Sequence, residues 1–593
     1  MVVFGPGFVW GDPNDWRYLW GDAGSGLAAF RYYVAEGWGF PLLQARGLNQ
    51  PDGINVAFTD SLPLLALLAK VVDPFGLDPA RWWGWWFLGL HVAQAATAAW
   101  AARAWGNRSP VVALSVATVA VSAPIFLLRT WHPGLAAQFL LLAAWAWVGE
   151  LRSPAMARRR WVVEGGGALL AVAALLTHVY LLLGVLVVTA GGAVDLTASG
   201  RRSVGDAARW LAIVAGAVVS AAVVMGYFSA GAAEAQGYEL FGMHLFGPVV
   251  AQQSWWWPGN EWTIQASGSF EAFNWLGFGW LGLLSVSGVA AVGRLRGAVV
   301  ARLGDGVTRH QVLLAALAVL TAYAVTPMVR LWDDDPHDLR TPLGWVVADR
   351  SLHRWIWGVG LLAVVALGLV LARRVGSRWW PGLGLLGAAT VALAGSILVS
   401  DALIAAITGQ FRIAGRLFWV VSYGTLAVGG GLLGRLGGRS GSWSRRLMAV
   451  AALAVAAIQV VDVPNWRELA GATLDPTPER VARLDALAGL IEGADELVVE
   501  PAFNCADLHG GLDGLWTFQD VGIVASWDRT PTTRVYAARR ADEPCDQPIA
   551  PVLAEGAVLV VVAPEAVTDE LLVRDDDWTC RREDLVLACR AGG

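Results

Sequence analysis

Two aspartates and two arginines stand out in this 593-residue chain because of the residues around them. Asp22 follows a glycine, and Asp60 precedes an apolar run. A carboxylate in such a place could accept a proton in a reaction, although it could equally cap a helix or lie solvated in a loop. Arg412 and Arg416 are four residues apart, so in a helix they would share one face and could hold a phosphate bidentately. Alternatively, both arginines extend toward lipid headgroups.

Four further polar residues lie next to predicted helix ends. His178 and His132 each lie at a predicted turn, and Glu271 with Asn274 opens a predicted helix. Their side chains could bind hydroxyl groups or a phosphate. The alternatives are that each histidine is a packing residue and that Glu271 caps its helix.

An acidic run at 333–338, which includes His337, could bind a divalent cation through its carboxylate oxygens. We favour a solvated acidic loop for this segment, and we predict no defined metal site elsewhere.

The composition predicts that these residues are positioned by membrane-spanning helices. Hydrophobic residues make up 56% of the chain and charged residues only 15%, whereas soluble proteins are usually about 25% charged. A span needs about 20 mostly apolar residues. Residues 82–463 are therefore expected to form a transmembrane domain, with spans near 82–104, 110–128, 132–149, 161–176, 178–195, 207–228, 272–293, 311–328, 353–372, 380–400, 417–434 and 446–463.

Clusters of arginine predict the orientation of these spans. Cytoplasmic loops carry the excess of Lys and Arg. All six clusters can face the cytoplasm only if 161–195 crosses the membrane twice, as a hairpin whose outer turn lies near His178. The clusters are at 103–108, 152–160, 201–209, 294–309, 373–378 and 435–446.

The first 81 residues are then expected to form an outer loop. Residues 1–58 are rich in Gly, Trp, Pro and Asp, and the apolar run 62–72 is too short to span, so it should be interfacial or re-entrant. A long outer segment is not easily exported without a preceding helix or signal. We therefore expect the natural gene to start upstream and to encode one more helix.

Residues 464–593 are predicted to form an extracytoplasmic soluble α/β domain. A helix is expected at 479–490 and buried strands at 496–500 and 558–562. All four cysteines lie here, which favours two disulfides in an oxidising compartment. The stretch 580–589 resembles a hairpin, so Cys580 is expected to pair with Cys589 and Cys505 with Cys545. A zinc site is the alternative, but the spacing lacks C-x-x-C pairs.

Short motifs along nearly the whole chain resemble an uncharacterised family of bacterial multi-pass membrane proteins, which is itself similar to the GT-C class of membrane glycosyltransferases. The motifs are residues 21–22 (Gly-Asp), 58–66 (Phe-Thr-Asp-Ser-Leu-Pro-Leu-Leu-Ala), 271–277 (Glu-Ala-Phe-Asn-Trp-Leu-Gly), 411–419 (Phe-Arg-Ile-Ala-Gly-Arg-Leu-Phe-Trp), 514–519 (Gly-Leu-Trp-Thr-Phe-Gln) and 536–539 (Tyr-Ala-Ala-Arg). The link to GT-C enzymes rests on architecture: many helices, a long first outer loop with an acid, and a C-terminal outer domain.

The resemblance implies an inverting transferase in the bacterial plasma membrane. Such enzymes pass a sugar from a polyprenyl-phosphate carrier to a glycan or protein acceptor at the outer face. On this resemblance Asp22 is the first choice for the general base and Asp60 the second. Arg412, Arg416 and His178 would hold the donor phosphate. Glu271, Asn274 and His132 would contact substrate.

Two other functions are compatible with the same sequence: a carrier of lipid-linked glycans, and a non-catalytic partner in envelope assembly. A transporter usually has an internal repeat with broken helices near the midplane, and no repeat is evident here. The chain has no basic, aromatic-interleaved stripe and a formal net charge of −5, so a nucleic-acid partner is not expected.

Overall fold

A computed structural model shows a mostly helical protein. It describes residues 5–12, 16–72, 77–153, 159–228, 241–256, 269–294, 310–325, 328–329, 339–340, 386–387, 390, 411–438, 442–472, 476–537, 544–546, 553–565, 567 and 577–591.

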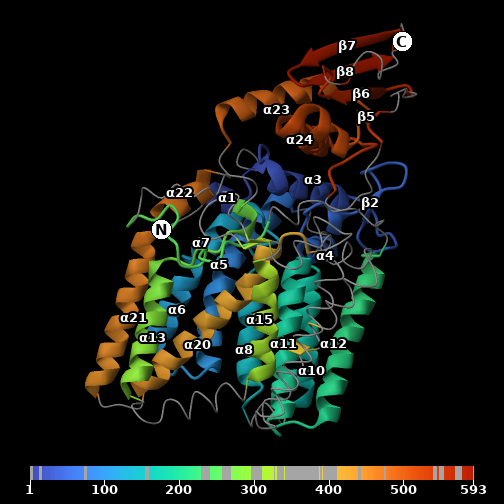
Figure 1. The fold of residues 1–593 in the computed structure, drawn as a ribbon. Helices are drawn as coiled ribbons and strands as arrows, with labels where there is room; N and C mark the ends of the chain where they lie inside the picture. The colour runs from blue at the N-terminus through green and yellow to red at the C-terminus, as the bar shows by residue number, and fades with distance from the viewer. Residues whose placement is uncertain are drawn as a thin grey trace.

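A bundle of apolar helices forms the largest part of the described chain (Figure 1). Its helices run up and down, with short turns between several consecutive pairs. They are α5 (Pro79–Ala104), α6 (Pro110–Val121), α8 (Phe139–Glu150), α10 (Arg160–Leu175), α11 (Val179–Ala198), α12 (Val204–Met225), α13 (Phe278–Arg294), α15 (Gln311–Ala324), α20 (Phe418–Gly438) and α21 (Ser442–Asp462).

Four described helices are long and apolar enough to cross a membrane, and one bent pair makes a fifth. The four are Val179–Ala198, Val204–Met225, Ala414–Arg435 and Trp443–Asp462. Ten of the twelve predicted spans overlap helices of the bundle, several of them shorter than expected. The predicted spans 353–372 and 380–400 lie outside the described residues, apart from three positions, so the count of twelve stays a prediction.

The two predicted spans that differ most from the observed helices are seven residues too long at one end, and proline explains both differences. The span predicted at 110–128 breaks after Val121, and a short helix α7 (Pro124–Leu127) follows at a bend of 47°. The span predicted at 132–149 begins only at Phe139, after the sequence His-Pro-Gly. Proline disfavours helical backbone in the residue before it and cannot donate to the preceding turn.

The two helices predicted within 161–195, with a turn near His178, are confirmed, whereas their crossing of a membrane stays a prediction. Helix α10 ends at Leu175 and α11 begins at Val179. His178 is the N-cap of α11, and its Nδ1 accepts the Tyr180 N–H at 3.2 Å. The Leu176 carbonyl in this turn accepts the Leu64 N–H of the N-terminal segment at 2.7 Å, so the turn lies at the end of the bundle that faces the C-terminal domain, which we call the domain end.

Arginines mark the opposite end of the bundle, which we call the far end. Arg103 and Arg435 lie in the last turns of α5 and α20, whereas Arg152 and Arg201 lie two and three residues after the ends of α8 and α11. The C-terminal ends of α5, α8, α11 and α20 lie at the end of the bundle away from the C-terminal domain (Figure 1). Residues 295–309 and 373–378, which hold two more of the predicted clusters, are outside the described residues.

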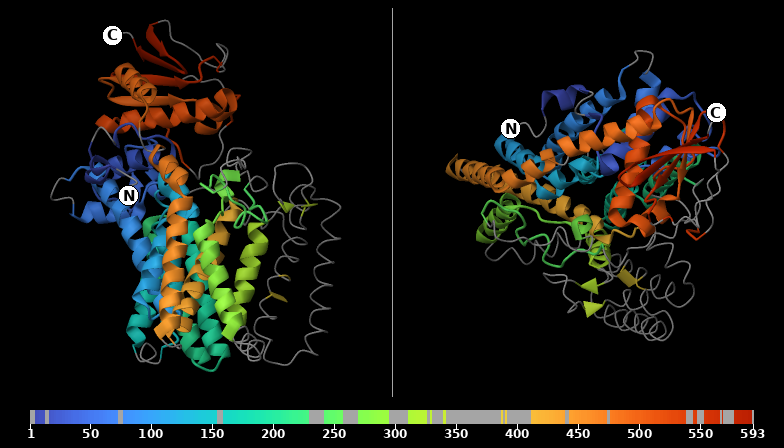
Figure 2. Two further views of the ribbon diagram at one scale, coloured as in Figure 1. Left: turned by 90° about the vertical axis from the view of Figure 1, so that its left-hand side faces the viewer. Right: turned by 90° about the horizontal axis from the view of Figure 1, so that it is seen from above.

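The N-terminal segment forms a layer between the bundle and the C-terminal domain (Figure 2). It contains α1 (Pro6–Trp10), a 15-residue helix α3 (Gly21–Ala35), a two-stranded ribbon of β1 (Gln44–Ala45) and β2 (Ile54–Asn55), the 3-10 helix η1 (Val56–Phe58) and α4 (Pro63–Val72). The apolar run 62–72 is thus one short helix, as its length predicts, whereas the sequence did not predict α3.

After the short helix α22 (Pro464–Ala472), the C-terminal domain consists of a four-stranded sheet with two helices on one face. The strand order is β5-β6-β8-β7, with β5 parallel to β6 and the other pairs antiparallel. Alternate residues of β6 face the two sides: Val558 and Val560 pack with the helices, and Leu559 and Val561 pack on the other face. The elements are α23 (Pro478–Ile491), β5 (Glu496–Glu500), α24 (Phe503–Asp528), β6 (Ala557–Val562), β7 (Trp578–Glu583) and β8 (Val586–Ala591).

The four cysteines form the two pairs that the sequence predicts. Cys580 and Cys589 are direct cross-strand neighbours in the β7–β8 hairpin and are bonded to each other. Cys505, in the first turn of α24, is bonded to Cys545.

Candidate active site

The N-terminal layer brings two carboxylates together. Asp22 lies in the first turn of α3, and Asp60 lies in the turn between η1 and α4. Helix α3 can approach this turn closely because position 26 is glycine: a Cβ there would lie 2.6 Å from the Asp60 carbonyl oxygen. Asp60 itself has a φ of 53°, a left-handed conformation that aspartate tolerates better than most residues.

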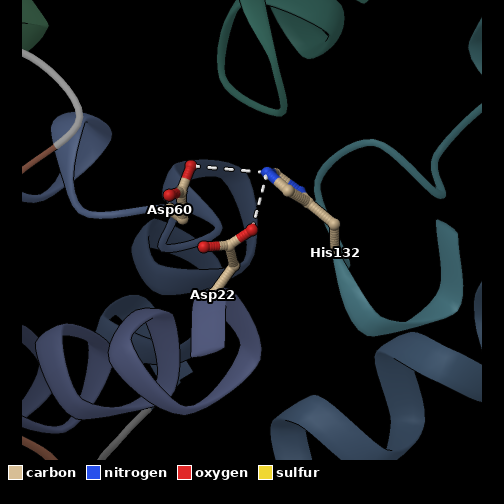
Figure 3. A group of neighbouring side chains, drawn as sticks. All are labelled: Asp22, Asp60 and His132. Atoms are coloured by element: carbon tan, nitrogen blue, oxygen red, sulfur yellow. Dashed lines mark ion pairs between the residues drawn. The ribbon is translucent and has the colours of Figure 1, made fainter. Parts of the chain in front are cut away.

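His132 bridges the two acids from the bundle side (Figure 3). It follows the 3-10 helix η3 (Leu128–Trp131). Its Nε2 lies 3.5 Å from Asp60 Oδ1 and 3.9 Å from Asp22 Oδ2, and its side chain is almost fully buried. We call Asp22, Asp60 and His132 the acid half of the site.

The two carboxylates have opposite pKa shifts. Burial, reinforced by the negative charge of Asp60, raises the pKa of Asp22 to about 7. Burial also disfavours ionisation of Asp60, but the contact with His132 outweighs it and lowers the pKa of Asp60 below its usual value. At neutral pH Asp60 is therefore ionised, whereas Asp22 is poised to bind or release a proton.

Two arginines hold a third carboxylate nearby. Glu271, in the 3-10 helix η4 (Ser269–Ala272), accepts from Arg129 Nη1 at 2.9 Å and pairs with Arg416 through the same oxygen. Arg129 also donates to the Glu271 carbonyl at 2.8 Å. Both guanidinium groups lower the pKa of Glu271 to about 2 despite its burial. We call Arg129, Glu271 and Arg416 the guanidinium half.

A single cavity of about 330 Å³ at the domain end connects the two halves. Its wall includes eleven charged or aromatic side chains that come from the N-terminal layer, the bundle and the C-terminal domain: Asp22, Phe58, Asp60, His132, His178, Tyr180, Tyr227, Glu271, Arg412, Arg416 and Tyr536. The structure thus brings together seven of the eight catalytic, phosphate-binding or substrate-binding residues predicted from the sequence.

Asn274 is the exception. It is buried and is not among the residues that line the cavity. Its side-chain amide donates to the Ala272 carbonyl at 2.8 Å and to the Gly415 carbonyl at 3.0 Å. This joins η4 to the 3-10 helix η6 (Ala414–Leu417), so Asn274 supports the segments that carry Glu271 and Arg416.

The arginine pair is not on one α-helix, as its spacing would allow. Arg412 lies in irregular backbone, and Arg416 lies in η6. Both still line the cavity, and Arg416 also lies 5.2 Å from the centre of the Tyr180 ring. Irregular backbone at Arg412 and the 3-10 turn at Arg416, rather than one helical face, therefore bring these two residues to one site.

His178 is a neutral neighbour of the acid half. Its ring centre lies 5.5 Å from that of His132. Burial, with the charges of His132 and Arg416, lowers the pKa of His178 well below its usual value. Since its Nδ1 accepts the Tyr180 N–H, the neutral ring carries its hydrogen on Nε2 and offers an N–H donor rather than a positive charge.

Sequence reasoning missed two residues of the site. Arg129 is an isolated charge within an apolar run just before His132, and such a charge usually has a buried partner. Tyr536 begins one of the C-terminal motifs, and its hydroxyl donates to Asp60 Oδ2 at 3.0 Å. Its place in the C-terminal domain gave no indication that it would reach the acid half.

The acid half could also hold a divalent cation. Asp22, Asp60 and His132 each offer one ligand atom, and these atoms lie within 4.8 Å of one another. Two carboxylate oxygens and one imidazole nitrogen suit zinc or manganese. The acidic run 333–338, where the sequence placed the candidate cation site, lies outside the described residues.

These features define a mostly helical, multi-pass membrane protein with a charged cavity at one end of its bundle. The chain belongs to the family described as "Domain of unknown function (DUF6311)", whose sequence profile matches residues 1–395, about two-thirds of the 593 residues. A crystal structure of ArnT from Cupriavidus metallidurans in the apo state is similar over 98% of this chain and 95% of that one, at 15% identity and a TM-score of 0.40. A TM-score this low does not establish a common fold. No curated protein matches the chain.

Proposed function

We propose that this protein transfers a sugar from a polyprenyl-phosphate donor to a glycan or protein acceptor of the cell envelope. The observation that carries this proposal is the cavity with two unlike halves. One half can take a proton and the other can hold an anion, which are the two tasks of glycosyl transfer from a lipid phosphate.

In the acid half, Asp22 is the general base. The acceptor oxygen attacks the anomeric carbon of the donor sugar, and Asp22 takes the proton that this oxygen loses. The bond between the anomeric carbon and the phosphate oxygen breaks, and the phosphate leaves with the electron pair. A base with a pKa near the working pH is the most effective in such a step, and the pKa of Asp22 is raised to about 7.

In the guanidinium half, the charge that develops on the leaving phosphate is stabilised. Arg129 and Arg416 outnumber Glu271 by one charge, so this half keeps a net positive charge. The buried Nε of Arg416 has no hydrogen-bond partner among the described residues, which leaves an N–H for a phosphate oxygen. Arg412, and His178 as a neutral donor, line the same cavity and would complete the phosphate contacts.

We assign the reaction to the extracytoplasmic face of a bacterial plasma membrane. Arginines at the far end of the bundle favour a cytoplasmic far end, and the paired cysteines of the C-terminal domain favour an oxidising compartment on the other side. A lipid-borne sugar would then reach the cavity from the membrane surface.

A divalent cation bound by Asp22, Asp60 and His132 would supply an additional positive charge next to the reacting groups. In that state the shift of the Asp22 pKa would be reversed, because the cation favours the ionised carboxylate. Parallel assays with a chelator and with added manganese or zinc distinguish the metal-free site from the cation-bound site.

The decisive experiment is transfer by the purified full-length chain in lipid nanodiscs. Labelled polyprenyl-phosphate sugars are offered with envelope glycans or proteins as acceptors, and product is counted for the wild type and for Asp22→Asn. Transfer that is lost in the variant supports the enzyme. Donor binding without transfer, or movement of a lipid-linked glycan across the bilayer, would instead favour the assembly partner or the carrier.

A further inference from the structure

Two further cavities lie along the seam between the N-terminal layer and the C-terminal domain. The first, of about 520 Å³, is bounded by α3, the start of α5 and the last turn of α24. The second, of about 430 Å³, is bounded by the end of α3 and the segment between β1 and β2. Ala35 and Arg529 line both cavities, so the two form one elongated depression that we call the seam groove.

Backbone contacts fix the two walls of the seam groove to each other. Thr532 N donates to the Gly47 carbonyl at 3.0 Å, and the Thr532 carbonyl accepts the Gln50 N–H at 2.9 Å. The Tyr32 hydroxyl donates to the Thr530 carbonyl. The groove is therefore preformed, and its side chains are positioned before a ligand arrives.

Arg31 gives the seam groove a half-buried positive charge. Its Nη1 donates to Ser526 Oγ at 3.3 Å, and it forms no ion pair with a described carboxylate. Burial lowers the pKa of Arg31, and the negative charge of Asp78 only partly offsets this effect. Since a guanidinium withdrawn from water is usually paired with an anion, its remaining N–H groups can receive an anionic group of a ligand.

The other charges of the groove leave a positive surplus. Two of its acids are already occupied by backbone N–H groups: Glu36 accepts those of residues 46 and 47 at 2.6 and 2.9 Å, and Asp78 accepts that of Ala80 at 2.7 Å. Asp528 is the third acid, against four arginines. Besides Arg31, three exposed arginines line the groove without an ion pair to a described residue: Arg17, Arg46 and Arg529.

Each cavity of the groove also has one tryptophan in its wall, and a cation holds each ring in place. The Arg17 guanidinium carbon lies 3.9 Å from the centre of the Trp527 ring in the first cavity. Lys70 Nζ lies 5.1 Å from the centre of the Trp38 ring in the second, and Trp38 is 53% exposed. The face of an aromatic ring is electron-rich and attracts the polarised C–H groups of a sugar.

The lining is too polar for a lipid chain. Among the described lining residues, Val34 and Leu77 are the only large aliphatic ones, whereas an acyl chain needs a continuous apolar wall. Arginines beside tryptophan rings instead suit a sugar chain that carries acidic groups.

We propose that the seam groove binds an acidic glycan, with Arg31 holding a carboxylate or phosphate group and Trp38 and Trp527 packing against sugar rings. In the transferase this glycan is the part of the acceptor remote from the reacting hydroxyl, and this clause alone rests on the proposed function. Helix α3 links the two sites: Asp22 in its first turn lines the cavity of the candidate active site, and Arg31 lies nine residues later, about 13 Å along the helix.

The test is binding of labelled oligosaccharides to the full-length chain in neutral phosphatidylcholine nanodiscs, followed by fluorescence polarisation. One acidic series carries uronic acids and a second carries phosphate groups. We expect at least one of them to bind, neutral oligosaccharides of the same length to bind roughly tenfold more weakly, and the affinity to fall as salt screens the arginines. Arg31→Gln, which keeps a donor for Ser526, should raise the Kd roughly 10- to 150-fold, the loss of one charge-assisted hydrogen bond.

Two variants at exposed positions keep the test independent of folding. Arg529→Gln changes the wall that both cavities share and should raise the Kd about 2- to 5-fold. Trp38→Leu should weaken only oligosaccharides long enough to reach the second cavity, by about 2- to 10-fold. Arg81→Gln is the matched control: this exposed arginine of α5 lines neither cavity, so the variant should bind as the wild type.

Three results would overturn the proposal. The first is that neither acidic series binds, and the second is that Arg31→Gln and Arg81→Gln lose affinity equally. The third is that short-chain phosphatidylglycerol binds while neither oligosaccharide series does, which would make the groove a site for lipid headgroups.

The binding assay separates this inference from the proposed function. Acidic-glycan binding that depends on Arg31, in a protein that transfers no sugar, would support the groove and contradict the transferase. In an active enzyme, Arg31→Gln should raise the acceptor KM far more than it lowers kcat. An acceptor KM that stays at the wild-type value would overturn the role of the groove and leave the transferase standing.

Discussion

The two halves of the cavity contain the same kind of group in opposite electrostatic states. Asp22 and Glu271 are both carboxyl groups that line one cavity, yet the pKa of Asp22 is raised to about 7 and that of Glu271 is lowered to about 2. Burial raises both values. The difference arises from the neighbours: Asp22 has a second carboxylate beside it, whereas Glu271 lies between two guanidinium groups.

The comparison shows how one small cavity can hold a proton acceptor and a fixed anion side by side. A carboxylate with surplus negative charge around it keeps a titratable proton near neutral pH. A carboxylate with surplus positive charge around it stays ionised and orients the arginines that surround it. The charges of Glu271 and Arg416 act on the pKa of Asp22 in opposite directions, so we predict that each half can be altered with little effect on the other.

Removing the base should have the largest effect. Asp22→Asn keeps the shape of the acid half but cannot take a proton, so turnover should fall by about 10²–10⁴ while donor affinity is kept. Single-turnover transfer assays and donor binding to the same preparation measure the two quantities. Asp52→Asn, an exposed acid of the same N-terminal layer, is the control and should behave as the wild type. If Asp22→Asn also loses donor binding, Asp22 contributes to donor binding as well as to proton transfer.

Removing one guanidinium should mainly weaken donor binding. Arg416→Ala is expected to raise the donor Kd by roughly 10- to 150-fold, the loss of one charge-assisted hydrogen bond of about 1.5–3 kcal/mol. The donor Kd of Arg416→Lys should lie between those of the wild type and Arg416→Ala, because an ammonium keeps the positive charge but cannot form the bidentate hydrogen bonds of a guanidinium. Titration with labelled donor measures the Kd of both variants. Arg582→Ala, which changes an exposed arginine, is the control. If Arg416→Ala binds the donor as well as the wild type but no longer transfers the sugar, Arg416 acts in the catalytic step rather than in donor binding.

The halves should also differ in their response to pH. Below pH 7 the Asp22 carboxyl is protonated in the folded protein and cannot act as a base, so kcat should rise about tenfold per pH unit and level off near 7. Glu271, with a pKa of about 2, stays ionised throughout, so donor affinity should stay constant between about pH 5 and 8. Parallel profiles of kcat and Kd check this, and a donor Kd that follows kcat would contradict the division into halves.

The disulfides should have the smallest effect, and only one of them should reach the acid half. The Cys505–Cys545 bond closes a 40-residue separation that includes Tyr536, and the Cys580–Cys589 bond closes one of 9. By loop length alone the bonds stabilise the domain by about 4 and about 2.6 kcal/mol. Replacing the first pair by serine should lower kcat as well as stability. Replacing the second should lower stability only, and neither should change donor affinity.

The sequence by itself determined most of the local structure. Apolar runs of helical length predict the bundle helices, two flanking arginine clusters predict the hairpin at His178, and short buried apolar runs predict β5 and β6. These patterns are local, because burial of a helix or strand is decided by residues a few positions apart. The same patterns also placed Asp22 and Asp60 in the first outer loop and Arg416 at an outer span boundary, on one side of the predicted membrane.

Only the tertiary structure decided which of these residues meet. Glu271 and Arg129 are 142 positions apart and Tyr536 and Asp60 are 476 apart, and no local pattern joins them. Their contacts depend on how η3, η4 and η6 pack at the domain end and on how residues 530–537 hold the C-terminal domain to the N-terminal layer. Such packing follows from the fit of many distant side chains at once. The charge of a residue is therefore evident from the sequence, but whether it becomes a base or a fixed ion is decided by neighbours that only the fold supplies.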